Sequence, residues 1–228
     1  MAKANSKFLK QQKVFVGLLL TGLVILVIYL SVIVAQDVSL GEFIPGEHYI
    51  ELEENYRVRG NKIEVVEFFS YACIVCYHFD PLITDWAKEN ENVVEFRLSP
   101  LPANETWRRM AQHYYTLERL DILEEHHKKF FFAVHEKNVN IGSPARVAEW
   151  AKEQSILGYK EAASSLYVKR KLASADQLAR SLKIASVPTL LVNGKYVITI
   201  TDKVGLVRML EILDYLVEKE LILSSGAQ

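Results

Sequence analysis

The chain has 228 residues, of which 50% are hydrophobic and 24% are charged, and its formal net charge is -1. This length suits one globular domain with an insertion, or two small domains, with enough apolar material for a sizeable core. Because phosphate binding needs a basic surface, the nearly neutral charge argues against nucleic acid as the main partner.

The N-terminal part carries a long apolar segment, from Val14 to Ala35, that lacks charged side chains. Its length fits the roughly 20 residues of a membrane-spanning helix. Lysines precede the segment and acidic residues follow it, so the positive-inside rule places the N-terminus in the cytoplasm and the rest of the chain outside. We predict an uncleaved anchor within residues 1–36. The alternative is a signal peptide cleaved near Ala35, although its apolar region usually spans only about 7–15 residues.

The next elements alternate between strand and helix. A short strand is predicted around Tyr49–Leu52. Residues Ile63–Phe69, with the sequence IEVVEFF, are typical of a central strand buried on both faces. Helical spacing then runs from Cys73 to about Asn90, and Val93–Leu98 is predicted to form another strand.

From Glu105 to about Leu182 the spacing of apolar residues is helical throughout. Within this block Ser143 is a predicted N-cap and Pro144 the first helical residue that follows it. Two further helices are expected over residues 158–171 and 174–182.

Strand character returns in VPTLLVNGKYVITI, residues 187–200, where Asn193 and Gly194 are typical of a two-residue hairpin turn. Residues 203–223 then form an amphipathic segment. The elements are therefore strand, strand, helix, strand, helical block, hairpin and helix, which indicates an α/β sheet interrupted by helices.

The two cysteines of the chain, Cys73 and Cys76, lie where the buried strand meets the helix. This spacing is typical of a redox dithiol or of half a metal site. Covalent haem is excluded because Tyr77, and not a histidine, follows the second cysteine. A structural zinc site needs four ligands, and the adjacent His126 and His127 are more typical of one surface and one core residue. We therefore predict a dithiol and no metal.

The two sulfur atoms are expected to differ in chemistry. Cys73 lies at the start of the helix, where unpaired backbone N–H groups and the helix dipole favour a thiolate. Cys76 lies one turn further along, on the apolar face. We predict that Cys73 exchanges disulfides with substrates and that Cys76 is its buried partner.

The sequence resembles the DsbA family of disulfide oxidoreductases, which have the thioredoxin fold. The resemblance begins near Gly46 and is carried by EHYIELEE, VVEFFSYACIVCYHF and SVPTLLVNGKY. It implies an α/β thioredoxin fold interrupted by an inserted all-helical domain. The one transmembrane helix predicted ahead of this fold departs from the usual members, which are mostly soluble. The thioredoxin-like parts would be residues 37–103 and 183–228, and the helical insertion would be residues 104–182.

The resemblance also implies roles for three further residues. Pro188 would be a cis proline beside the dithiol, leaving Val187 free to pair with an extended substrate segment; an ordinary trans proline is the alternative. Glu67 would be a buried acid that relays protons for Cys76. A carboxylate in an apolar strand is costly unless it is paired or protonated, and the alternative is a side chain that reaches solvent.

The dipeptide between the cysteines, Ile74 and Val75, departs from the Pro-His of most family members. Loss of that histidine removes a donor to the Cys73 thiolate, so we expect a higher Cys73 pKa and a less oxidising disulfide. The reduction potential should lie between the roughly -120 mV of the family's strong oxidant and the roughly -270 mV of thioredoxin.

The predicted function is the donation of disulfide bonds to unfolded or cysteine-containing proteins, with no cofactor beyond the Cys73–Cys76 disulfide. The predicted location is the bacterial inner membrane, with the catalytic domain in the periplasm, or the soluble periplasm after cleavage. A quinone-linked membrane reoxidase would be the partner of such an oxidase. A membrane-anchored reductase or isomerase, supplied by an electron-donating membrane protein, and a non-enzymatic anchored chaperone are the alternatives.

Overall fold

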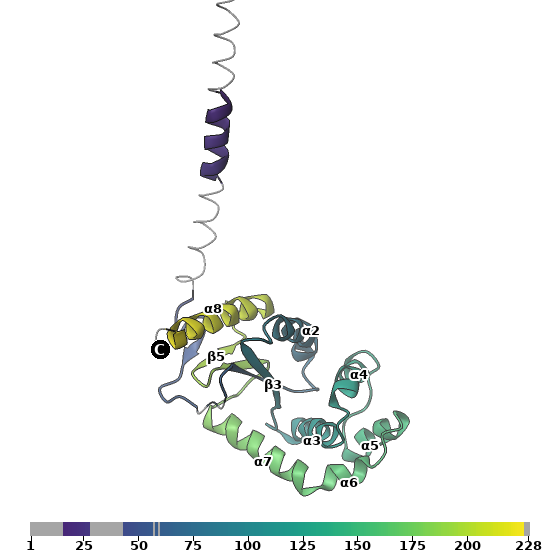
Figure 1. Ribbon diagram of the computed structural model, residues 1–228. Helices are drawn as coiled ribbons and strands as arrows, with labels where there is room; N and C mark the ends of the chain where they lie inside the picture. The colour runs from purple at the N-terminus through teal and green to yellow at the C-terminus, as the bar shows by residue number, and fades with distance from the viewer. Residues whose placement is uncertain (1–15, 28–42, 57, 59, 226–228) are drawn as a thin grey trace, which may run out of the picture. The chain divides into compact units, whose positions relative to one another are not determined.

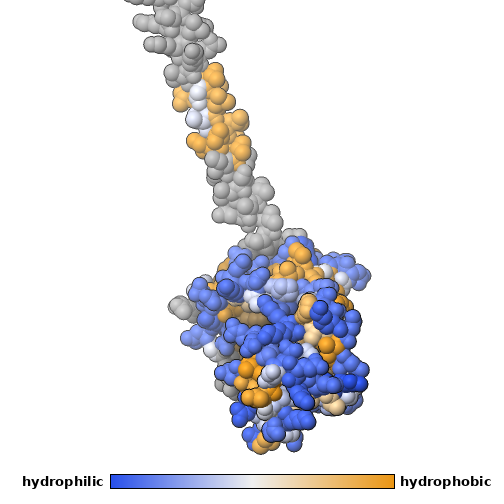
Figure 2. Space-filling view, turned by 90° about the vertical axis from the view of Figure 1, so that its right-hand side faces the viewer, coloured by the Kyte–Doolittle hydropathy of each residue, from blue (hydrophilic) through white to orange (hydrophobic). Residues whose placement is uncertain are grey.

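The computed structural model describes residues 16–27, 43–56, 58 and 60–225. Met1–Ile44 and Pro45–Gln228 are two separate units. In the first unit residues 16–27 are helical, and most of their side chains are hydrophobic (Figure 2). The predicted apolar segment from Val14 to Ala35 lies partly outside the described residues. Among the helices that are described, none combines the length and the apolar character needed to cross a membrane.

Within the described residues, a five-stranded sheet is the centre of the second unit (Figure 1). Strand β2 runs parallel to β3 and antiparallel to β4, while β4 pairs with β5 and β5 with β1, both antiparallel. Because β2 has a neighbour on each side and is almost completely buried, the prediction of a central strand is confirmed. The strands are β1 (Ile50–Glu51), β2 (Ile63–Phe69), β3 (Val94–Pro100), β4 (Thr189–Val192) and β5 (Tyr196–Thr199), in the order β1-β5-β4-β2-β3.

Helices cover both faces of this sheet (Figure 1). On one face lie α2 (Ile74–Glu89) and α8 (Leu206–Ser225), which are joined where the indole N–H of Trp86 donates to the Asp214 carboxylate over 2.6 Å. On the other face the C-terminal end of α7 (Leu166–Ser181) packs Leu178 against the β2 side chains. This arrangement buries both sides of β2.

The predicted hairpin joins β4 to β5, and its turn residues Asn193 and Gly194 have φ angles of 49° and 65°. The turn is fixed to α8 by the buried carboxylate of Glu220. This carboxylate accepts hydrogen bonds from Lys195 Nζ over 2.6 Å, from the Tyr196 hydroxyl over 3.1 Å and from the Asn193 amide. The hairpin and the last helix therefore hold each other in place.

The helical block predicted between Glu105 and Leu182 is confirmed. Ser143 caps α5 and Pro144 is its first residue, as predicted. The block consists of α3 (Glu105–Arg119), α4 (Leu123–His135), α5 (Pro144–Glu153), α6 (Tyr159–Ser164) and α7.

The predicted division of its last part is wrong. The break between helices falls at Ser165, and α7 then continues through residues 172 and 173, where a gap was expected. The backbone of Ser165 is extended, and its hydroxyl accepts a hydrogen bond from the Val168 N–H, which begins a new helix. Leu172 and Ala173 are both good helix formers, so nothing interrupts the helix there.

Candidate active site

Cys73 is the N-cap of α2. Its backbone is extended, with φ -98° and ψ 111°, and its sulfur accepts a hydrogen bond from the Cys76 N–H over 3.1 Å. The Cys73 N–H itself donates to the carbonyl of Ser70 over 3.0 Å. Both cysteines are free thiols. The sulfur of Cys73 thus takes the place that a serine or aspartate oxygen fills at other helix starts.

The surroundings of the two thiols shift their pKa values in opposite directions. The Cys76 thiol donates a hydrogen bond that lowers the pKa of Cys73 to about 7, with further help from the backbone N–H groups of Cys76 and Val75 and against the effect of burial. Cys76 is fully buried, and this burial, together with the neighbouring Cys73, raises its pKa far above the ordinary value. Near neutral pH the thiolate therefore forms on Cys73.

Val187 and Pro188 lie beside this sulfur, where the family resemblance implied that they would be. The peptide bond between them is cis, and the Cys73 thiol donates to the carbonyl of Val187 over 3.6 Å. The sheet explains the contact between residues so distant in sequence. Phe68 near the end of β2 pairs with Thr189 at the start of β4, so the loop before β4 reaches the loop after β2.

Glu67 is buried in β2, where only 2% of its surface is exposed. Its Oε2 atom has no hydrogen-bond partner within the described part of the chain. Burial raises the pKa of this carboxyl well above 4.5, and the neighbouring Asp80 and Cys73 raise it further. Its protonated form is thus favoured. The burial of Glu67 excludes the alternative of a side chain that reaches solvent.

Ile74 and Val75 are exposed at the start of α2, with 49% and 37% of their surfaces accessible. Their side chains are hydrocarbon and offer no donor to the neighbouring sulfur. The surface next to Cys73 is therefore apolar. Among the described residues, the hydrogen bonds that the Cys73 sulfur accepts come from backbone N–H groups and the Cys76 thiol.

The prediction that only one of His126 and His127 is a core residue is wrong, because both are buried. His127 belongs to a hydrogen-bonded chain in which its Nδ1 atom contacts the Tyr71 hydroxyl over 2.7 Å and its Nε2 atom contacts Asp80 over 2.9 Å. The sequence reasoning left His127 as a structural residue and did not consider Asp80. The position of Asp80 on the buried face of α2, four residues after Cys76, is the signal in the sequence that could have identified it.

The helical block also contacts the loop that precedes the dithiol. The ring N–H of His135 in α4 donates to the carbonyl of Tyr71 over 2.8 Å. The same imidazole stacks on Tyr77, with ring centroids 5.2 Å apart and planes inclined by 19°. The start of α2 is therefore held between the sheet and α4.

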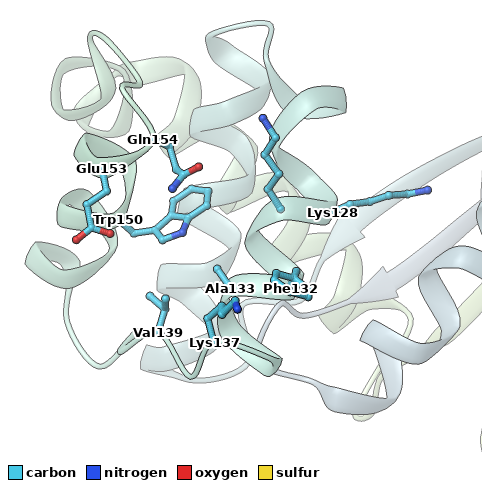
Figure 3. Close-up of a pocket in the computed structure, with 9 residues that line it drawn as sticks. Lys128, Phe132, Ala133, Lys137, Val139, Trp150, Glu153 and Gln154 are labelled. Atoms are coloured by element: carbon cyan, nitrogen blue, oxygen red, sulfur yellow. The ribbon is translucent and has the colours of Figure 1, made fainter.

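A pocket of about 590 Å³ lies elsewhere in the helical block, between α4 and α5. Figure 3 shows Phe132, Val139 and Trp150 around it, with Lys137 at its edge. None of its lining residues belongs to the dithiol loop.

The face shown in Figure 2 is mainly polar, with small separate hydrophobic patches. No group of three or more His, Cys, Asp or Glu residues with a metal-binding arrangement occurs in the parts of the chain that are described.

Comparisons with known proteins agree with this geometry. A family model described as a DSBA-like thioredoxin domain matches residues 64–216. The thiol:disulfide interchange protein DsbA of Azotobacter vinelandii is 33% identical over 189 residues, which cover 82% of this chain and 88% of that protein. The corresponding protein of Pseudomonas aeruginosa is 32% identical over 186 residues, which cover 78% of this chain and 86% of the relative.

Solved structures show the same similarity. The crystal structure of Pseudomonas aeruginosa DsbA has a TM-score of 0.75 at 30% identity and covers 80% of this chain and 97% of that one. The structure of DsbA from Xylella fastidiosa has a TM-score of 0.72 at 29% identity, over 79% of this chain and 98% of that one. The chain therefore belongs to the DsbA family of thioredoxin-like thiol:disulfide oxidoreductases.

Proposed function

We propose that this oxidoreductase donates its Cys73–Cys76 disulfide to the thiols of other proteins. The observation that carries the proposal is the contrast between the two sulfur atoms: that of Cys73 caps α2 and accepts the Cys76 N–H, whereas Cys76 is fully buried. Their pKa values are shifted in opposite directions accordingly. A substrate thiolate attacks Cys73, a mixed disulfide forms, and the electron pair of the broken bond stays on Cys76. A second substrate thiol then displaces Cys73, which leaves readily because its thiolate is stabilised. The pair itself carries the electrons, so the reaction needs no further cofactor.

The surroundings of the dithiol support roles for the remaining site residues. The carbonyl of Val187, held beside Cys73 by the cis bond to Pro188, offers a backbone partner to an extended substrate segment. Ile74 and Val75 add an apolar surface that suits the hydrophobic stretches of unfolded chains. Glu67, whose burial favours the protonated form of its carboxyl, would give a proton to the leaving Cys76 thiolate.

The proposed redox poise is intermediate. The Cys73 pKa of about 7 equals the value of about 7 for the thioredoxin cysteine and exceeds the value of about 3.5 for a strongly oxidising DsbA. A less stable thiolate makes the disulfide a weaker oxidant. This supports the expectation that the Ile-Val dipeptide reduces oxidising power, and it favours a reductase as the second candidate function.

We further propose that the chain works in the bacterial periplasm, anchored through the apolar segment from Val14 to Ala35. The absence of charge from that segment supports the proposal, as does the lysine-rich sequence before it. The catalytic part would combine thioredoxin-like residues 37–103 and 183–228 with a helical insertion at 104–182. Its redox partner would be a quinone-linked membrane protein for an oxidase, or a membrane electron donor for a reductase.

The experiment that tests the direction of electron flow is the reduction potential of the Cys73–Cys76 pair. The full chain is equilibrated with glutathione buffers of graded ratio, and the fraction of disulfide is measured after acid quenching. We expect a potential between the roughly -120 mV of the family's strong oxidant and the roughly -270 mV of thioredoxin. A potential at or below the thioredoxin value would overturn disulfide donation and support the reductase.

A further inference from the structure

The pocket between α4 and α5 is built from residues that take no part in the dithiol site. Its volume of about 590 Å³ lies within the roughly 300–1,000 Å³ that is usual for ligand sites. Helix α4 supplies Phe132 and Ala133, the segment after it supplies Val139, and α5 supplies Trp150. The indole of Trp150 points from α5 toward α4 (Figure 3). Apolar side chains from three segments therefore form the walls of the pocket.

These walls are fixed by backbone hydrogen bonds and by burial. The N–H of Val139 donates to the carbonyl of Ala133 over 3.0 Å, and the N–H of Lys137 donates to that of Phe132 over 3.2 Å. The segment after α4 is thereby folded back onto the helix. Trp150 on the opposite side is only 4% exposed, whereas Phe132 is 46% exposed. A site that is already formed loses little freedom on binding, and an exposed aromatic ring at its edge is available to a partner.

The rim of the pocket carries an excess of positive charge. Its charged residues are Lys128, Lys129, Lys137 and Glu153. Lys129 pairs with Glu125 over 2.8 Å. Among the described residues, no carboxylate pairs with the exposed Lys128 or Lys137. The ammonium group of Lys137 lies instead 5.5 Å from the ring centre of Phe132. Two uncompensated cations therefore stand beside an exposed aromatic side chain.

We propose that this pocket binds an acidic segment of a protein partner. An aromatic or branched apolar side chain of that segment enters between Phe132 and Trp150. The carboxylates that flank it in the segment face Lys128 and Lys137. Burial of the apolar side chain supplies free energy of binding, and the complementary charges select the partner.

A polypeptide segment suits the site better than an anionic lipid surface. The site is a concavity of limited volume, whereas a lipid surface requires a broad exposed face. In addition, the carboxylate of Glu153 in its rim would repel anionic head groups. The segment needs no cysteine, because none of the lining residues belongs to the dithiol loop. The inference thus goes beyond disulfide exchange and does not depend on it.

The probe is a cysteine-free hexapeptide, acetyl-Glu-Asp-Leu-Phe-Asp-Glu-amide, titrated into the full chain at low salt. Binding is followed by NMR through the indole N–H signals of the three tryptophans, of which Trp150 alone lines the pocket. Trp150→Phe assigns its signal. We expect a saturable shift of the Trp150 signal, while the signals of Trp86 and Trp107 stay in place. A peptide with lysine at its four acidic positions, and one with Ser-Ser in place of Leu-Phe, should each bind at least about fivefold more weakly.

Charge complementarity predicts effects of opposite sign at the two sides of the rim. Lys128→Gln and Lys137→Gln should each weaken binding about twofold to fivefold, the effect of one exposed ion pair. Glu153→Gln should strengthen binding by a similar factor, because it removes a like charge. Lys152→Gln is the matched control, since Lys152 is exposed on α5 next to Glu153 but does not line the pocket. It should leave the affinity unchanged.

The apolar part of the site is tested by Phe132→Ala, which should weaken binding at least about fivefold. Half exposure of this side chain makes the variant compatible with the fold. A Trp150 signal that does not move up to millimolar peptide would overturn the proposal. Equal binding of the Ser-Ser peptide, or equal affinity of the lysine, glutamate and control variants, would show unspecific attraction of charge and overturn it as well.

A lipid partner is the remaining outcome to separate. Vesicles of anionic phospholipid should not displace the peptide. Displacement would identify a membrane surface as the occupant and would overturn the assignment to a protein segment. All these outcomes leave disulfide exchange untouched, because the peptide carries no thiol.

Discussion

The backbone N–H of Cys76 donates to the Cys73 sulfur over 3.1 Å, and the Cys76 thiol donates to the same atom. The thiol is the larger cause of the lowered Cys73 pKa of about 7. Cys76→Ala should therefore raise the pKa of Cys73, whereas Cys76→Ser, which keeps a donor, should raise it less. The ultraviolet absorbance of the thiolate as a function of pH measures both values. Equal values in the two variants would contradict this assignment.

Removing either sulfur should separate the two steps of exchange. Cys73→Ser should abolish oxidation of a peptide dithiol, because Cys73 is only partly buried whereas Cys76 is buried, so the Cys73 sulfur is the one that a substrate can reach. Cys76→Ala should instead accumulate mixed disulfides, since the buried thiol that resolves them is missing. Non-reducing electrophoresis detects these adducts. A variant that binds unfolded chains without forming adducts would indicate a chaperone, and full activity of Cys73→Ser would contradict disulfide donation through this residue.

A histidine in place of Val75 should make the protein a stronger oxidant. Val75 is partly exposed beside the sulfur, and a donor there would stabilise the thiolate. Each unit by which the Cys73 pKa falls stabilises the reduced form by about 1.4 kcal/mol, which raises the reduction potential by roughly 30 mV. Glutathione equilibration measures the change. Val75→Leu is the control that keeps the apolar character, and an unchanged potential in Val75→His would refute the role given to the dipeptide.

Glu67→Gln should stabilise the fold at neutral and alkaline pH. The pKa of Glu67 is raised on folding, so the folded state holds the proton more tightly. Stability is therefore lost as the pH rises from about 4.5 through the folded-state pKa. The glutamine variant lacks this loss, and each gain of about 1 kcal/mol would raise Tm by about 2–4 °C.

Urea unfolding at several pH values measures this difference, which should vanish below about pH 4.5. Glu64→Gln is the matched control, since Glu64 lies on the same strand but is partly exposed and pairs with Arg97 over 2.8 Å. A pH-independent difference between Glu67→Gln and the wild type would contradict the linkage.

Gly194→Ala should destabilise the fold. Gly194 has a φ of 65°, and an added Cβ would lie 2.0 Å from the Tyr56 carbonyl oxygen. Strain at such a position costs about 1–3 kcal/mol before the displacement of the neighbouring backbone is counted. Thermal unfolding should show a lower Tm than in Gly205→Ala, because a Cβ at Gly205 meets no atom within 4 Å. Equal Tm values would show that the hairpin tolerates a different turn.

Local patterns were enough to predict a strand, a helix cap and a turn of the fold. The apolar run of β2, the Ser143 cap and the Asn193-Gly194 turn each depend on neighbours in sequence, and the structure confirms all three. The position of Cys73 at the start of α2 followed from the junction of strand and helix in the same way.

Contacts between distant segments could not be predicted in this way. The hydrogen bonds of His127 join α4 to residues 47 and 56 positions away, and no periodicity encodes such a pairing. The same holds for the burial of His126, since helical spacing alone does not tell how many faces of α4 are covered. The helix break at Ser165 was missed because one hydroxyl that accepts from Val168 outweighs a run of good helix formers.

The reactive sulfur is also the atom that begins helix α2. A thiolate is a strong acceptor for the first-turn N–H groups, and a disulfide sulfur is a weak one, so each oxidation removes a helix cap and each reduction restores it. Such caps are worth about 1 kcal/mol. Restoring the N-cap of α2 therefore contributes part of the free energy that drives electrons from substrate to enzyme. The stability of this helix is thus one of the terms that set the reduction potential.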